Sequence, residues 1–215
     1  MHLFVERSSY NVAMTTMQLS AHAATPCDFI DAVSVRTQSS GDSLRLTYVV
    51  SGDILRLTVP ESRPPARADG LWRTTCFEIF LRPAGSDAYR EFNFSPSGEW
   101  AAYSFTGYRQ GMTTLDQPRP PLITCARTAQ RLEVDVQLQS PPLAQPNLRA
   151  ALSEVLKHRD GQISYWALAH PAAKPDFHDA VGFVAEGLGV GWASVFHRAQ
   201  VPSPSHEIRH RSPAR

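Results

Sequence analysis

The sequence predicts an all-β protein that folds as an antiparallel β-sandwich with little helix. Seventeen prolines and twelve glycines divide its 215 residues into short segments. Most of these segments alternate apolar and polar residues, or are rich in β-branched and aromatic residues, as strands are. About eight to ten such strands separated by turns are typical of a sandwich. A chain of this length fits one domain with loose ends.

Composition excludes several classes of protein. Hydrophobic residues make up 42% of the chain and charged residues 19%, which argues against disorder. No apolar run is long enough to span a bilayer. The net charge of +1 supplies no electrostatic reason to bind nucleic acid or anionic lipid. We therefore expect neither nucleic acid nor a membrane as a partner.

The cysteines and the N-terminal residues indicate a cytoplasmic protein. The three cysteines include no C-x-x-C pair, so they suit neither a disulfide framework nor a zinc knuckle. The first residues contain an acid, a base and a polar run where a signal peptide needs an apolar stretch. We expect no metal and no cofactor.

The first predicted strands are residues 44–50 (LRLTYVV) and 54–59 (ILRLTV). They flank Ser51-Gly52-Asp53, whose glycine suits a tight connection, so the pattern predicts a hairpin. Residues 60–69 follow with three prolines, which lack the backbone donor that a sheet needs. This stretch is predicted to be a loop.

A three-stranded meander is predicted over residues 75–82, 89–95 and 100–105, with short turns between the strands. Because side chains alternate along a strand, Phe77, Ile79 and Leu81 share one face and Glu78 lies on the other. Residues 89–95 likewise place Phe92 and Phe94 on one face and Tyr89, Glu91, Asn93 and Ser95 on the other.

The remaining predicted strands include one ambiguity. Residues 131–138 alternate cleanly and are predicted to be half-buried. Residues 148–158 also fit a helical stripe, but Asp160-Gly161 followed by residues 163–170 is a hairpin signal that needs a strand before its turn. We expect the start of this segment to be helical or irregular, its end to be extended, and any helix to lie between Pro146 and Leu156.

Three segments carry a resemblance to a known family: ADGLWRTTCFEIFLRP (68–83), YREFNFSPSGEWAAYSFTGYRQGM (89–112) and SYWALAHPAAKPDFHDAVGF (164–183). Over about residues 17–184 the chain resembles the DOMON-like proteins, relatives of the family 9 carbohydrate-binding modules. Within them it is similar to a bacterial group related to a segment attached to some UDP-N-acetylenolpyruvoylglucosamine reductase-like proteins. The resemblance implies an immunoglobulin-like sandwich whose relatives bind sugars or haem on one sheet face, mostly without catalysis.

The resemblance divides the chain into three parts. Residues 1–16 are expected to be a disordered N-terminal extension, residues 17–184 the DOMON-like sandwich and residues 185–215 an irregular tail. The tail lacks strand alternation and is rich in arginine, serine and proline. A frameshifted or fused C-terminus is one explanation for it.

Residues suited to a sugar gather in the predicted meander. A sugar site needs a flat aromatic platform and planar hydrogen-bonding groups for the hydroxyls. The candidate ligand-binding residues are Trp72, Arg73, Glu78, Asn93, Tyr108 and Arg109. Glu78 and Asn93 are expected to face each other on neighbouring strands, and Trp72 is a better platform than Trp100. The alternative is structural: Glu78 pairs with Arg73 or Arg82, and the tryptophans lie in the core.

A second candidate is the loop that holds His170, Lys174 and His178. Imidazole and carboxylate groups such as those of its histidines and Asp176 can bind a metal or transfer protons, but their spacing matches no zinc motif. A structural loop or a ligand contact are the alternatives.

The sequence carries none of the usual hydrolase, metalloprotease or nucleotide-binding motifs. We expect a non-catalytic domain that binds a sugar, another carbohydrate or a sugar-like small molecule. A carrier of haem or another small ligand, or an accessory subunit of a cell-wall or sugar enzyme, is the alternative function.

Overall fold

A computed structural model describes residues 14–40, 43–139 and 147–186 of the chain. Within these residues, eleven strands form one sheet in the order β7-β6-β5-β4-β10-β11-β1-β2-β3-β9-β8, and β12 pairs with β10. All pairings are antiparallel. The strands are β1 (Met14–Ala21), β2 (Ile30–Ser40), β3 (Ser43–Gly52), β4 (Cys76–Pro83), β5 (Tyr89–Phe94), β6 (Trp100–Phe105), β7 (Thr113–Thr114), β8 (Leu122–Arg127), β9 (Arg131–Gln139), β10 (Leu148–Lys157), β11 (Ile163–Ala167) and β12 (Ala185–Glu186).

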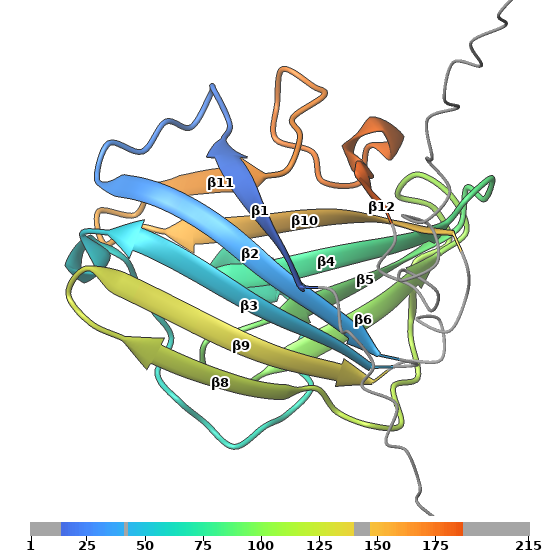
Figure 1. Ribbon diagram of the computed structural model, residues 1–215, viewed down its shortest axis with the longest axis horizontal. Helices are drawn as coiled ribbons and strands as arrows, with labels where there is room; N and C mark the ends of the chain where they lie inside the picture. Colours follow the sequence, from blue (N-terminus) through green and yellow to red (C-terminus); the bar gives the residue numbers. More distant parts are fainter. Residues whose placement is uncertain (1–13, 41–42, 140–146, 187–215) are drawn as a thin grey trace, which may run out of the picture.

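The sheet curls so that its two halves face each other (Figure 1). Strands β1, β2, β3, β9 and β8 form one layer, and β7, β6, β5, β4, β10 and β11 form the other. The layers join where Ser20 and Ala21 of β1 pair with β11. The all-β prediction is thus confirmed as a curled antiparallel sheet, and the immunoglobulin-like arrangement stays a prediction.

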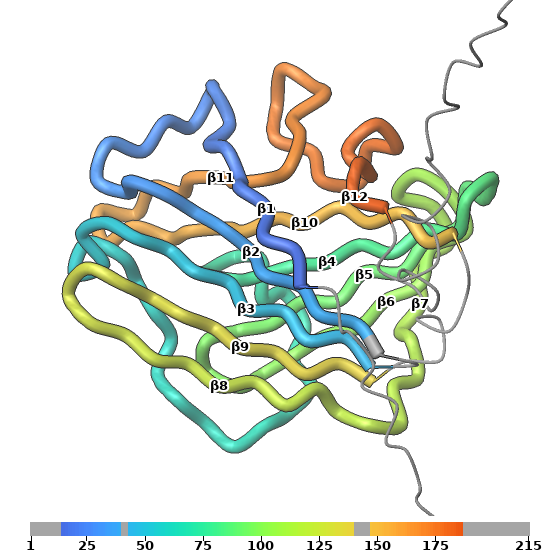
Figure 2. Tube along the Cα trace, viewed as in Figure 1, coloured from blue at the N-terminus to red at the C-terminus, as the bar shows by residue number. Residues whose placement is uncertain are grey.

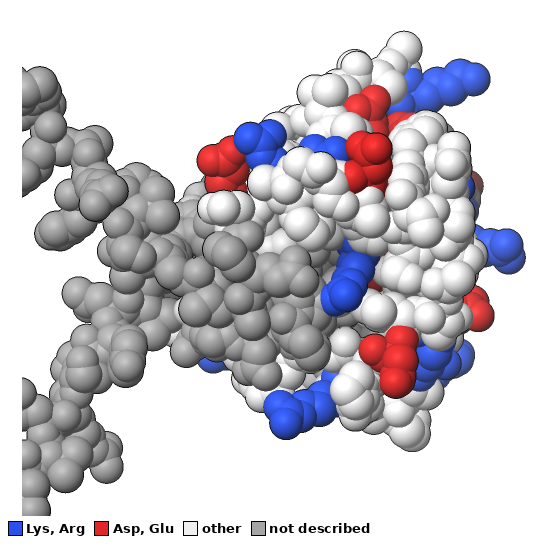
Figure 3. All heavy atoms as spheres, turned by 90° about the vertical axis from the view of Figure 1, so that its right-hand side faces the viewer, with Lys and Arg blue, Asp and Glu red and all other residues white. Residues whose placement is uncertain are grey.

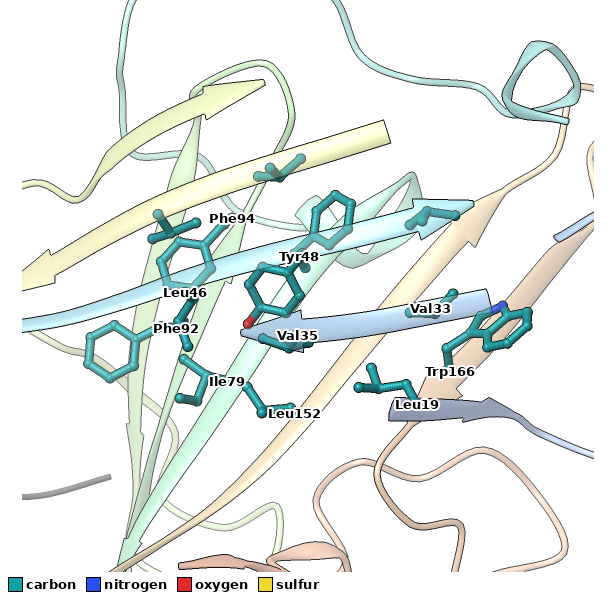
Figure 4. Close-up of a cluster of buried hydrophobic side chains, with 14 of the residues drawn as sticks. Leu19, Val33, Val35, Leu46, Tyr48, Ile79, Phe92, Phe94, Leu152 and Trp166 are labelled. Atoms are coloured by element: carbon teal, nitrogen blue, oxygen red, sulfur yellow. The ribbon is translucent and has the colours of Figure 1, made fainter. Parts of the chain in front are cut away.

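The main core lies between the layers. Figure 4 shows Val35, Leu46 and Tyr48 of one layer beside Ile79 and Phe92 of the other. The Tyr48 ring is fully buried, and its hydroxyl donates to the backbone carbonyl of Glu78, with an O–O distance of 3.0 Å. This hydrogen bond satisfies the hydroxyl and ties β3 to β4 across the core.

The predicted meander is confirmed by β4, β5 and β6, which pair in chain order. Phe77, Ile79 and Leu81 belong to the main core, as their alternation predicts. Cys76 and Phe80 point to the opposite face and belong to a second apolar cluster there. The central strands therefore bury both faces.

The predicted hairpin at residues 44–59 is wrong. Residues 54–56 form a 3-10 turn, η1 (Ile54–Arg56), and β3 pairs with β2 and β9 instead. Gly52 has a φ of 142°, and a Cβ there would lie 2.3 Å from the Phe29 carbonyl oxygen. The glycine thus allows close approach to β2. The chain then continues toward β10, where the Thr58 amide donates to the Lys157 carbonyl.

The expected helical start of residues 148–158 is also wrong. Strand β10 begins at Leu148 and pairs with β4 on one side and β11 on the other. These cross-strand hydrogen bonds outweigh the helical propensity of the segment. The hairpin at Asp160-Gly161 is confirmed, although β11 ends at Ala167.

Some elements fall outside the sequence predictions. Strands β1, β2, β7, β8 and β12 were not predicted, and further 3-10 turns lie at η2 (Leu71–Arg73) and η4 (Ala180–Gly182). The described residues contain no α-helix. None of their helical turns has the length and apolar character needed to cross a membrane. Residues 1–13 of the expected extension and 187–215 of the expected tail lie outside the described residues.

Glu154 of β10 points into the main core. It pairs in register with Phe77 and Trp166, both core residues, and its side chain is fully buried. Neither of its carboxyl oxygens has a hydrogen-bond partner among the described residues. Burial raises its pKa well above the usual range. Burial therefore favours the neutral form of this carboxyl in the folded protein.

We expect Glu154→Leu to raise the free energy of unfolding at pH 7 by about 1–3 kcal/mol, because it removes an unsatisfied buried polar group. The folded state keeps a proton that the unfolded state loses above about pH 4.3, so Glu154 lowers stability as pH rises. The Glu154→Leu variant should lose part of that decline, which begins above about pH 4.3. Urea unfolding measures both effects. Glu61→Leu, in an exposed loop, is the control, and a destabilised Glu154→Leu variant at pH 7 would contradict this account.

Candidate functional site

A cavity of about 440 Å³ lies on the outer face of the β4 layer, opposite the main core. Strands β4, β5, β6, β10 and β11 contribute its residues, and the chain around residues 106–112 and 168–179 surrounds it. The segment between β11 and β12 runs along the β10 and β11 side of the sheet (Figure 2). The volume is within the range of small-molecule sites.

Two carboxyl groups lie in this cavity. Glu78 of β4 and Glu91 of β5 both line it, and they are only 3% and 5% exposed. Glu78 Oε2 accepts a hydrogen bond from the Ser153 hydroxyl at 2.9 Å, and Glu91 Oε1 accepts one from Asn93 Nδ2 at 2.7 Å. Each carboxyl keeps its other oxygen without a hydrogen bond in the described part of the chain. The cavity thus presents two acceptors or, when protonated, donors.

Burial controls the charge of this pair. Loss of solvent, and secondly the neighbouring Glu91, raise the pKa of Glu78 to about 8. Burial also raises the pKa of Glu91, against the opposing effects of Asn93 and Arg109. At neutral pH the pair therefore holds at least one proton, and one carboxyl can donate while the other accepts.

Aromatic rings form most of the cavity wall. Trp72 follows Gly70, whose left-handed backbone (φ 74°) starts the 3-10 turn η2. The Trp72 side chain is 38% exposed and meets Tyr103 edge to face, with ring centroids 6.1 Å apart. The aromatic lining residues are Trp72, Phe80, Tyr103, Phe105, Tyr165 and Phe177.

Asp176 joins the two loops over the cavity. Its carboxylate accepts hydrogen bonds from the Tyr108 hydroxyl at 2.5 Å and from Arg109 Nη2 at 2.8 Å. It also accepts from the His178 amide. Burial alone would raise the pKa of Asp176, but the hydrogen bonds from Tyr108 and Arg109 outweigh it and lower that pKa. Asp176 is therefore ionised and neutralises Arg109.

His178 and Tyr89 form a second link between the loops. The Tyr89 hydroxyl lies 2.7 Å from His178 Nδ1 and accepts the Arg109 amide at 3.2 Å. Burial, followed by the charge of Arg109, lowers the pKa of His178 to about 4. The ring is thus neutral at pH 7, and its Nε2 lies 3.9 Å from Glu91 Oε2.

The structure brings together four of the residues that the sequence nominated. Trp72, Glu78, Arg109 and His178 all line the cavity, so the meander candidates and the second loop belong to one site. Asn93 lies opposite Glu78 in register, as expected. It is fully buried behind the lining, with its Oδ1 unpartnered among the described residues.

Other nominated residues lie elsewhere. Tyr108 contacts the rim through Asp176, and Arg73 is exposed beside the cavity entrance residue Trp72 without lining the cavity. His170 binds the Ser20 carbonyl through Nε2 at 2.8 Å, and Lys174 is exposed. Of the residues proposed from the sequence, Arg73, His170 and Lys174 therefore do not line the cavity.

The structural alternative applies to Trp100 but not to Glu78. Trp100 belongs to the main core and is 7% exposed. Glu78 bonds to Ser153, whereas Arg82 donates to the Ala180 carbonyl. The pairing of Glu78 with Arg73 or Arg82 is therefore absent from the described structure.

The sequence reasoning missed several lining residues. Glu91 was already on the correct strand, and alternation alone places it on the Glu78 face. Tyr165 and Phe177 have no such signal, because they reach the cavity through the pairing of β11 with β10 and through a loop.

The charged residues show no metal-binding cluster. In residues 14–40, 43–139 and 147–186 no group of three or more His, Cys, Asp or Glu side chains is placed to hold a metal ion. On the face seen in Figure 3, basic and acidic side chains lie interspersed outside the grey region. That view shows no large patch of one charge.

Comparison with known proteins supports the fold. No protein-family profile and no curated protein matches the sequence. A protein of Bacteroides uniformis ATCC 8492, provisionally described as carbohydrate-binding, is similar in structure with a TM-score of 0.59 and 15% identity, covering 80% of this chain and 84% of its own. A family 9 carbohydrate-binding module of Caldicellulosiruptor kristjanssonii matches with 12% identity and a TM-score of 0.45 in its glucose complex, covering 74% of each chain. Its cellotriose complex matches with 13% identity and a TM-score of 0.42, covering 74% of this chain and 73% of its own.

We expect Asp176→Ala to loosen both loops while leaving the sheet folded. The variant loses the shared acceptor of Tyr108 and Arg109, and a partly exposed ion pair of this kind contributes at most about 1 kcal/mol to stability. Amide hydrogen exchange should accelerate in residues 106–112 and 174–179.

Acidification should have the same effect on the wild type. Because the folded pKa of Asp176 is lowered, its contribution is present above about pH 3.9 and is lost as pH falls through the folded value. Asp160→Ala, in the β10–β11 turn, is the control. Unchanged exchange in the Asp176→Ala variant would show that Asp176 does not hold the loops.

Proposed function

We propose that this protein is a non-catalytic domain that binds a sugar or sugar-like small molecule in the cavity above β4 and β5. The observation that carries the proposal is the combination of aromatic wall and buried carboxyl floor in one cavity. The DOMON-like membership and immunoglobulin-like arrangement suggested by the sequence are part of this proposal. The likeness to the Bacteroides protein bears on the fold, and the chemistry of the cavity bears on the ligand.

The aromatic wall suits the apolar face of a sugar ring. Trp72 is partly exposed at the cavity, so a ligand that stacks on it would remove its apolar surface from water. The Tyr103 hydroxyl donates a hydrogen bond to Asp69 Oδ1 at 2.6 Å. This bond fixes the ring that Trp72 packs against. The platform is therefore formed before a ligand arrives, and preorganisation lowers the cost of binding.

The floor suits hydroxyl groups. A sugar hydroxyl both donates and accepts, and Glu78 and Glu91 offer both functions when they share a proton. Arg109 adds fixed donors at the rim, since Asp176 holds its guanidinium. Buried polar groups discriminate strongly against ligands that leave them unpaired. Soluble sugars and nucleotide sugars are the ligand class we propose, because we expect a cytoplasmic location from the sequence.

We expect Trp72→Ala to weaken binding of a sugar about tenfold or more, because it removes the stacking platform. A thermal-shift screen of monosaccharides, N-acetylated sugars and nucleotide sugars first finds a ligand, since ligand at about 100 times its Kd stabilises by roughly 2.7 kcal/mol. Calorimetric titration then measures the affinity of wild type and variant.

The control for this experiment is Leu122→Ala. Leu122 is an exposed apolar residue of β8 in the other layer, so its removal should leave the affinity unchanged. Equal affinities of wild type and Trp72→Ala for the best ligand would place the site away from this cavity. A Soret band in the purified protein would favour the haem-carrier alternative.

A further inference from the structure

The charges around the cavity do not balance. Two carboxyl groups, Glu78 and Glu91, form its floor, while Arg109 is the cation that lines it within the described residues. Arg109 already forms a 2.8 Å ion pair with Asp176. His178 is buried and bonded to Tyr89. Arg109 attracts both carboxyls without forming an ion pair with either. The neutral His178 ring lies 3.9 Å from Glu91, so neither carboxyl has a close cation among the described residues.

Buried carboxyls are ordinarily paired, hydrogen-bonded on both oxygens, or neutral. Here each carboxyl lines the cavity and has one oxygen bonded, to Ser153 or to Asn93, while its other oxygen has no hydrogen bond among the described residues. The unbonded oxygens belong to adjacent strands, because Glu78 is opposite Asn93 and Glu91 is opposite Phe80. An ammonium group has three donors and one positive charge. It can therefore donate to the unbonded oxygens and also balance the charge of an ionised carboxyl.

We propose that the cavity selects ligands with a protonated amino group, such as amino sugars, and that Glu78 and Glu91 receive this group. The inference rests on the proposed function, which it narrows from sugars in general to amino sugars. The aromatic wall supports the same choice, because a cation over the face of Trp or Tyr is attracted by the ring. A neutral sugar supplies no positive charge to favour ionisation, so the pair would keep its proton when such a sugar binds.

The proposal predicts proton release on binding. In the empty cavity burial keeps a proton on Glu78, whose pKa is about 8. An ammonium beside it favours the ionised carboxylate, so that proton leaves to solvent as the ligand enters. Titratable or charged groups face the pair from the strands and from the loops. Those on the strands are Cys76 on β4, Tyr89 on β5, Tyr103 on β6 and Tyr165 on β11. The loops add Arg109, Asp176 and His178, whereas β10 presents the uncharged Ser153 and Val155.

The test compares three probes that share one ring size: glucosamine, glucose and N-acetylglucosamine. Calorimetric titrations of the whole chain at about pH 6.5, in two buffers with different ionisation enthalpies, report both affinity and protons released. We expect glucosamine to bind at least tenfold more tightly than the other two and to release a measurable fraction of a proton. Glu78→Gln should reduce that preference to near one and abolish the release. Glu91→Gln should also reduce the preference, because it removes the second carboxyl that receives the amino group.

Glu133→Gln is the matched control. Glu133 lies on β9 in the other layer and pairs with Arg131, so the preference for glucosamine should survive its replacement. If glucose or N-acetylglucosamine binds as tightly as glucosamine, without proton release, the amino-group inference is overturned and sugar binding stands. If none of the three sugars binds, and the wider sugar screen is also negative, the proposed function falls and the inference falls with it.

Discussion

The central strands of this protein must bury both of their faces. In β4 the first six residues, Cys76–Leu81, are all buried. One face packs into the core between the layers, and the other needs a separate cover. That cover comes from 3-10 turn η2 and from the two loops joined by Asp176. The cavity is the part of the outer face that these elements surround, so the double burial of the strands creates the candidate site.

The same constraint gives three glutamates unusual surroundings. Glu154 lies in the closed core, where no ligand reaches it, and its neutral carboxyl costs stability. Glu78 and Glu91 lie on the other face, where each is half satisfied and opens on the cavity. Tyr48 connects the two environments, since its hydroxyl crosses the core to hold the backbone at Glu78. Burial therefore lowers stability at Glu154, whereas at Glu78 and Glu91 it raises the pKa of groups that line the cavity.

Local patterns in the sequence predicted the strands with clear alternation. The faces of β4 and β5 follow from residue order alone, and so does the shared face of Glu78 and Glu91. Elements set by distant contacts could not be predicted this way. Residues 54–59 look like a strand, but the close approach at Gly52 and the hydrogen bond from Thr58 to Lys157 direct them elsewhere. Tyr165 and Phe177 reach the cavity only because β10, β11 and the following loop are placed by the fold.

We propose that the outer face of β4 and β5 is the ligand site. Chemical-shift mapping on isotope-labelled protein tests it most directly, because it reports the position of a bound sugar without any substitution. The account predicts that the largest amide shifts lie in β4, β5 and β6 and in residues 106–112 and 174–179. Shifts confined to β2, β3, β8 and β9, in the opposite layer, would contradict it.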